Sequence, residues 1–144
     1  MFTERAEVVV ARPPEEVFPF VADARNRPLW DESVGTEELT SPEPIGVGST
    51  LRTRLRSMGR DLEYRWEVAE HDPPRRVRVE STAGPFPTTL EWDVGPHAGG
   101  SVVAFAVTGR PGGGLRLLQP LIARNTARNL DRSFPRLKEV LESR

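Results

Sequence analysis

The C-terminal stretch from Leu115 to Ser143 constrains the fold most, because it is the only segment long enough for an extended amphipathic helix. At about 100° per residue, the large apolar residues of its second half share one face: Leu130, Phe134, Leu137 and Leu141. Toward the N-terminus the same face carries small or polar residues: Gln119, Ala123, Thr126 and Ala127. A closely packed helix needs bulk along its whole buried face. We therefore expect the second half to plug a core and the first half to cover a cavity.

Most of the chain before this helix alternates between apolar and charged residues, as strands with one dry and one solvated face do. Five such strands are predicted, and their inward residues are Leu51, Thr53, Leu55; Leu62, Tyr64, Trp66, Val68; Val77, Val79, Ser81; Thr88, Leu90, Trp92, Val94; and Val103, Phe105, Val107. The turns between them are short. Short turns join antiparallel neighbours, so the sequence predicts a meander.

The N-terminal part predicts a strand followed by two short helices. Glu7 to Ala11 is a β-branched run, and Pro14 to about Ala24 has helical spacing that Pro19 interrupts. A second helical turn is expected from Asn26 to Trp30, and a weak strand from Val34 to about Thr40.

Charge patterning predicts the register of the meander. Across the turn at 72–74, Glu67 would pair with Arg78 and Arg65 with Glu80, because a slip by two residues would place Glu67 opposite Glu80. Across the next turn, one allowed register pairs Arg78 with Glu91 and Arg76 with Asp93.

A sheet with one solvated face needs a cover on the other, and only the C-terminal helix is long enough. The expected fold is α+β, in the order β-α-α-β6-α: a curved antiparallel sheet of about seven strands wrapped around the long C-terminal helix, in a single domain over residues 1–144.

Composition excludes several classes of function. The 20 basic and 21 acidic residues nearly balance, which argues against a nucleic-acid partner. The absence of cysteine excludes disulfides, thiolate metal sites and cysteine nucleophiles. The N-terminus does not read as a signal peptide and no apolar run is long enough to span a membrane, so we expect a cytoplasmic protein.

The order of elements resembles the START-like, or SRPBCC, superfamily, known for the helix-grip fold, and is most similar to its bacterial polyketide cyclase/dehydratase-like members. The residues that carry the resemblance are the 11–18 segment, the 26–30 segment, the 46–50 loop, the strand of Trp66 that ends at 73–77, and the end of the last helix at 137–141. The superfamily includes lipid and sterol carriers, hormone receptors and aromatase/cyclases. The resemblance implies an apolar pocket between the sheet and the C-terminal helix.

The predicted pocket lining is mostly apolar or aromatic, as small-molecule sites are. The candidate ligand-binding residues are Trp30, Leu51, Thr53, Leu55, Tyr64, Trp66, Val79, Ser81, Leu90, Trp92, Phe105, Gln119, Ala123 and Thr126. The alternative is that the aromatic residues simply fill the core.

No catalytic, metal or cofactor motif is present, and no metal ion or cofactor is expected. Tyr64 is the best inner-face candidate for a proton donor, although it equally suits an ordinary buried tyrosine. His71 and His97 lie in turn segments and are interpreted as surface residues. Asp31 is expected to cap or flank a turn, with a place at the pocket mouth as the alternative.

Two functions follow from this pattern. The first is binding of a small hydrophobic ligand, an aromatic or polycyclic metabolite or a lipid. The second is a cyclase, aromatase or dehydratase that uses the same cavity mainly to fold its substrate. A third possibility is a protein-interaction role for the charged outer face of the sheet. The sequence leaves the oligomeric state open.

Overall fold

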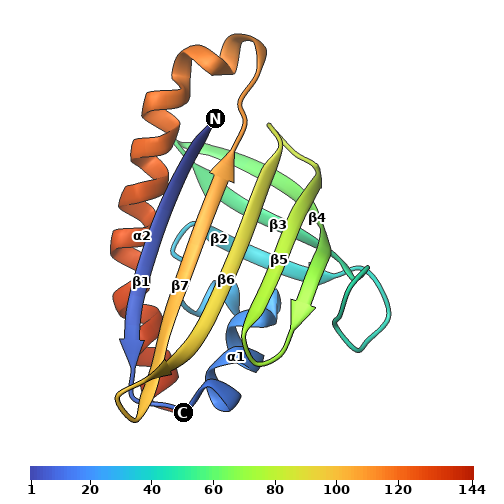
Figure 1. Cartoon of the computed structure of the whole chain (residues 1–144). Coiled ribbons are helices and arrows are strands. Elements are labelled where there is room, and N and C mark those ends of the chain that lie inside the picture. Colours follow the sequence, from blue (N-terminus) through green and yellow to red (C-terminus); the bar gives the residue numbers. More distant parts are fainter.

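The computed structural model describes residues 1–144 and shows a curved sheet beside one long helix (Figure 1). The strands are β1 (Phe2–Val10), β2 (Val34–Leu39), β3 (Thr50–Ser57), β4 (Arg60–Asp72), β5 (Arg76–Ala83), β6 (Thr88–His97) and β7 (Gly100–Gly109). The α-helices are α1 (Pro14–Ala22) and α2 (Gln119–Glu142), and the 3-10 helices are η1 (Ala24–Leu29) and η2 (Gly113–Leu118).

All seven strands form one antiparallel sheet in the order β1-β7-β6-β5-β4-β3-β2. The predicted order β-α-α-β6-α is confirmed, and so is the curved seven-stranded sheet with its long C-terminal helix. In Figure 1, α2 runs alongside β1, while α1 and the C-terminus lie together at the end opposite η2. No helix is long and apolar enough to cross a membrane.

The first strand begins five residues earlier than the predicted start at Glu7. It pairs with β7 along its whole length, from Phe2 opposite Gly109 to Val10 opposite Ser101. Hydrogen bonding to a long neighbour thus extends a strand beyond its most apolar part. Pro19 lies inside α1 without ending it, since Phe20 and Val21 after it are still helical and buried.

The predicted register across the 72–74 turn is wrong. Glu67 lies opposite Glu80, and Arg78 pairs with Glu70, so the expected pairs of Glu67 with Arg78 and Arg65 with Glu80 do not form. The alignment already differs next to the turn, where Asp72 pairs with Arg76, so the turn lies further along the chain than the charge pattern predicts. A bulge just before Glu70 then adds one residue to β4 and moves the alignment by one more position. The repulsion between the two glutamates is moderated by Arg78, whose Nε lies 3.7 Å from Glu80 Oε1.

The next register is as predicted. Arg76 lies opposite Asp93 and Arg78 opposite Glu91. Arg76 Nη1 donates to both oxygens of Asp93 at 2.9 Å. No bulge interrupts this pair of strands, so counting from the turn leads to the correct alignment.

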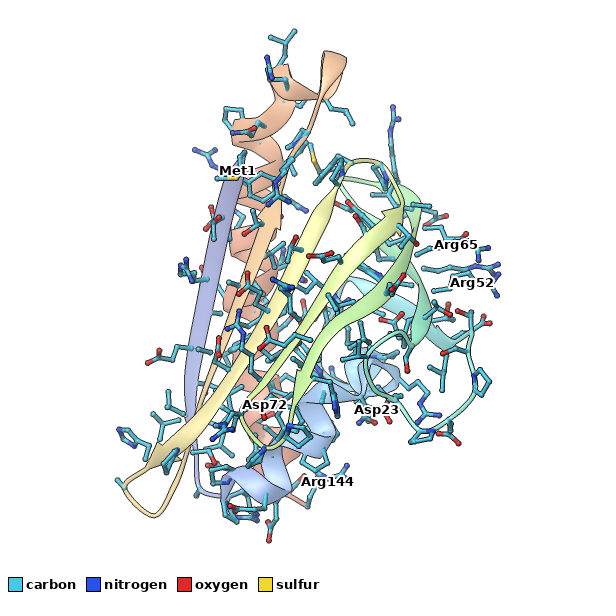
Figure 2. All side chains as sticks on the ribbon, turned by 45° about the vertical axis from the view of Figure 1, so that its right-hand side comes forward. Met1, Asp23, Arg52, Arg65, Asp72 and Arg144 are labelled. Atoms are coloured by element: carbon cyan, nitrogen blue, oxygen red, sulfur yellow. The ribbon has the colours of Figure 1, made fainter.

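The outer face of the sheet is charged and solvated. Arg52 and Arg65 face each other across β3 and β4, and Figure 2 shows both projecting outward from the same part of the sheet. Arg52 is held by Glu38, with 2.7 Å between Nη2 and Oε2. Exposed ion pairs of this kind contribute little to stability, so this face adds little to what the core supplies.

The core lies between the sheet, α1 and the second half of α2. The predicted apolar face of α2 is confirmed, because Leu130, Phe134, Leu137 and Leu141 are each at most 4% exposed. By contrast, no residue from Gln119 to Asn129 is fully buried. The helix thus has a packed half and a loosely covered half.

Candidate functional site

The inner face of the sheet changes character along its strands. Near α1 its side chains are completely buried, as Val77 and Val103 show at 1% and 0% exposure. Toward the end where α2 begins, the inward Leu55, Leu62 and Val107 are only half-buried. Access to solvent therefore increases along the concave face toward the first half of α2.

The first half of α2 bridges the two sides of the curved sheet. At its start, Gln119 Oε1 accepts a hydrogen bond of 2.9 Å from the N-terminal amine of Met1, at the beginning of β1. Further along, Asn125 Nδ2 donates to Ser57 Oγ at the end of β3, at 3.0 Å. Ala123 and Thr126 are half-buried. These side chains are small, so they cover the sheet with less bulk than the second half of the helix does.

Three of the predicted lining residues belong to a packed aromatic cluster. Trp92 lies 5.5 Å from Trp30 and 4.3 Å from Phe105, measured between ring centroids. Phe134 of α2 closes the cluster, 5.7 Å from Trp30 and 6.0 Å from Trp92. All four are at most 4% exposed. The structure thus brings Trp30, Trp92 and Phe105 together within the core, against the second half of α2.

A second aromatic pair stands on β4. The rings of Tyr64 and Trp66 stack with centroids 4.8 Å apart, and the indole Nε1 of Trp66 donates to Thr53 Oγ1 at 2.8 Å. Leu51, Val79 and Leu90 are buried on the neighbouring strands, whereas Ser81 is half-buried.

The hydroxyl of Tyr64 is hydrogen-bonded within the protein. It lies 3.1 Å from Thr88 Oγ1, and Thr88 in turn donates to the carbonyl of Phe86 at 3.1 Å. Because the threonine proton is used there, the tyrosine is the donor in the first bond. Burial raises the pKa of Tyr64, and its hydrogen bonds offset this only in part. Tyr64 therefore holds its proton firmly, which favours its interpretation as a structural tyrosine.

A buried carboxyl lies beside this pair and was not anticipated from the sequence. Glu37 of β2 is opposite Thr53, and its side chain is 1% exposed. Thr53 Oγ1 donates to Glu37 Oε2 and accepts from Trp66, so one chain of hydrogen bonds joins the carboxyl to the indole.

A bulge at Gly35 turns Glu37 inward. Val34 pairs with Leu55 and Thr36 with Arg54, so two steps on β2 match one step on β3. Without that extra residue, period-two alternation from Val34 would have directed Glu37 to solvent. A glycine inside a strand is a recognised sign of a bulge, and it was the one signal in the sequence for this site.

Arg27 lies between two carboxyls. Its Nη2 is 2.9 Å from Asp31 Oδ2, and its Nη1 is 3.6 Å from Glu37 Oε1. Asp31 also accepts hydrogen bonds from Asn129 Nδ2 of α2 at 2.9 Å and from the Ser33 hydroxyl at 2.8 Å. Asp31 thus accepts more hydrogen bonds than Glu37 does, and it links the segment after η1 to α2.

The environments of the two acids drive their pKa values apart. Burial raises the pKa of Glu37 from 4.5 to about 7, against the opposing effects of the Arg27 charge and the Thr53 hydrogen bond. For Asp31, burial also acts upward, but the Arg27 charge and the hydrogen bonds from Asn129 and Ser33 outweigh it and lower its pKa. Two nearby acids separated in this way are a common arrangement for exchanging a proton near neutral pH.

An open surface pocket of about 570 Å³ lies at the adjoining ends of β2, β3 and β4. Its apolar lining residues are Val34, Leu55 and Leu62, and Leu55 is the one predicted lining residue among its walls. The pocket also includes Ser33, which binds Asp31. This pocket therefore lies next to the polar cluster formed by Arg27, Asp31 and Glu37.

The two histidines lie apart from this cluster. His71 is half-buried against the ring of Phe18, with centroids 5.6 Å apart, and His97 is exposed at the end of β6. No three histidine or acidic side chains are grouped so that they could hold a metal ion.

The sequence matches one family model over residues 1–142, described as "Polyketide cyclase / dehydrase and lipid transport". No match to the sequence was found among the curated proteins.

Solved structures share the fold over almost the whole chain. TTHA0849 from Thermus thermophilus is 23% identical, with a TM-score of 0.85 and coverage of 99% of this chain and 98% of that chain. The Zhui aromatase/cyclase from a Streptomyces species is 15% identical, with a TM-score of 0.79 and coverage of 99% and 94%. A START superfamily protein from Mycobacterium smegmatis is 15% identical, with a TM-score of 0.79 and coverage of 98% and 97%. These similarities confirm the expected START-like, helix-grip fold.

Proposed function

Because this chain belongs to the polyketide cyclase/dehydrase and lipid transport family, we propose that it binds a small hydrophobic ligand between its sheet and the first half of α2. The ligand is an aromatic or polycyclic metabolite or a lipid. The contrast in burial along α2 carries this proposal, since a helix that only plugged a core would be buried along its whole inner face.

In this proposal the predicted lining residues have different places. Tyr64 and Trp66 form an aromatic wall, and Gln119, Ala123 and Thr126 form the cover. The packed cluster of Trp30, Trp92 and Phe105 forms the floor, while the remaining lining residues complete the sides: Leu51, Thr53, Leu55, Val79, Ser81 and Leu90.

Filling the covered space from α2 tests the proposal. We expect Ala123→Trp to weaken binding of the apolar dye Nile red at least tenfold, because the indole would occupy the ligand volume. Titration of dye fluorescence measures the affinity, and circular dichroism verifies the fold. Arg124→Trp is the matched control, since Arg124 is exposed on the same turn and its replacement should leave binding unchanged. Unaltered dye binding by Ala123→Trp would contradict the proposal.

A second candidate function is a cyclase, aromatase or dehydratase activity in the same cavity. The separated pKa values of Asp31 and Glu37 support it, because they supply a proton-exchanging group near neutral pH. Mass spectrometry of compounds that co-purify with the protein distinguishes the two functions. An unchanged ligand supports binding alone, whereas conversion that Tyr64→Phe or Glu37→Gln abolishes supports catalysis. The cytoplasmic location stays a prediction, which cell fractionation would check.

A further inference from the structure

Two buried polar atoms of the Arg27–Glu37 pair lack a hydrogen-bond partner in the protein: Glu37 Oε1 and Arg27 Nε. Nearly all buried polar atoms in folded proteins are paired, because leaving one unpaired destabilises the fold. Both belong to one ion pair, in which Arg27 Nη1 lies 3.6 Å from Glu37 Oε1. This place in the fold therefore favours an additional polar group.

When Glu37 is protonated, both atoms can donate a hydrogen bond. The guanidinium Nε can only donate. Glu37 Oε2 already accepts a hydrogen bond from Thr53, so the proton of a neutral Glu37 belongs on Oε1, which has no hydrogen-bond partner in the protein. A carbonyl oxygen has two lone pairs and is a suitable acceptor for donors of this kind.

An aromatic surface is joined to the Arg27–Glu37 pair through Thr53. Thr53 joins the Glu37 carboxyl to the Trp66 indole, and the Trp66 ring stacks on Tyr64. A ligand whose oxygen reached Glu37 would thus have an aromatic wall one hydrogen-bonded residue away. Flat apolar groups pack well against such rings.

We propose that Glu37 Oε1 and Arg27 Nε form the polar end of the ligand site and bind the carbonyl oxygen of an apolar ketone. This inference rests on the proposed function, because it places one atom of a ligand that the cavity must first admit.

Titration of Glu37 should make the binding of a ketone depend on pH. The charged or titratable groups that act on Glu37 are Arg27 and Asp31, whereas β3 and β4 face it with the uncharged Thr53 and Trp66. Since the pKa of Glu37 is about 7, the neutral donor prevails at pH 6 and the carboxylate at pH 8. The carboxylate has no proton to donate to a ketone. Ketone affinity therefore falls as the pH rises.

Equilibrium dialysis with a matched pair of probes tests this. The probes are 2-acetonaphthone, which has a carbonyl group, and 2-ethylnaphthalene, which lacks one. The ratio of their affinities removes general effects of pH on the cavity. In the unaltered protein we expect this ratio to fall about tenfold between pH 6 and pH 8, following the neutral fraction of an acid whose pKa is about 7.

Two variants assign the effect to Glu37. Glu37→Gln keeps an N–H donor that does not titrate, so the ratio should become independent of pH while the ketone is still preferred. Glu38→Gln is the control. Glu38 is the next residue on β2, is half-exposed and pairs with Arg52, and its variant should behave as the unaltered protein does.

The outcomes separate the two proposals. If 2-ethylnaphthalene binds but the ratio does not change with pH, or changes equally in Glu37→Gln, the carbonyl site is wrong and the two atoms hold an ordered water only. In that case the hydrophobic cavity stands. If neither probe binds at either pH, the proposed function is overturned and the carbonyl site falls with it.

Discussion

Arg27 contacts two neighbouring acids, Asp31 and Glu37, at different distances. Asp31 receives the closer contact with Arg27 and further hydrogen bonds from Ser33 and Asn129. Glu37 receives one hydrogen bond, from Thr53, and a longer ion pair. The buried charge is therefore stabilised on Asp31, and the raised pKa belongs to Glu37.

The raised pKa of Glu37 should make the stability of the protein depend on pH. Because the folded pKa of Glu37 exceeds its ordinary value of 4.5, the folded state binds the proton more tightly, and stability is lost as the pH rises from about 4.5 through 7. Replacing Glu37 with Gln removes this loss. We expect equal stabilities at pH 5 and a variant more stable by roughly 2–3 kcal/mol at pH 8. Urea unfolding at both pH values measures the difference, and a constant difference would contradict the raised pKa.

At the scale of elements, α2 has two halves with different tasks. The second half carries the large buried residues of the core, including Leu137 at 0% exposure. The first half has small half-buried residues on one side and an exposed leucine on the other, Leu121 at 51% exposure. One continuous helix thus supplies both a core and a cover.

Substitution of one leucine in each half should reveal this division. Leu137→Ala leaves a cavity in the packed core and is expected to cost about 2–5 kcal/mol. Leu121→Ala removes an exposed side chain and should change stability by less than about 0.5 kcal/mol. Chemical denaturation of both variants provides the comparison. Similar costs at the two positions would show that the first half is packed as tightly as the second.

Across the whole molecule, one end is rigidly packed and the other is held by few contacts. Near α1, inward residues of the sheet such as Val77 and Val103 are completely buried. At the opposite end, α2 is held by polar contacts of Gln119 and Asn125, and Leu55 and Val107 retain solvent access. The open end is therefore the natural route to the proposed cavity.

Hydrogen exchange should follow this gradient. We expect amides of residues 119–129 to exchange faster than those of residues 130–142, because local opening is easiest where few apolar contacts are made. Bound 2-acetonaphthone should slow exchange mainly in the first segment. Mass spectrometry of peptides from the two segments reports both effects, and uniform protection along α2 would contradict the gradient.

Residue periodicity is enough to predict the architecture and the two halves of α2. A chain displays this periodicity before it folds: the period-two strands, and the helical face that changes from Gln119 and Ala123 to Leu137 and Leu141. Where turn spacing was uninterrupted, it also predicted the correct partner of Arg76.

The polar part of the site, by contrast, depends on how the strands align in the folded sheet. Bulges at Gly35 and before Glu70 each add one residue to a strand. Such an extra residue changes the face to which the following side chains point, and it changes which residues of the two strands lie opposite each other. Charge pairing contributes too little energy to prevent such a shift when apolar packing favours it. The inward turn of Glu37 and its contacts with Arg27 and Thr53 therefore arise only when separate strands pack together. That alignment is a property of the packed sheet and not of any single segment.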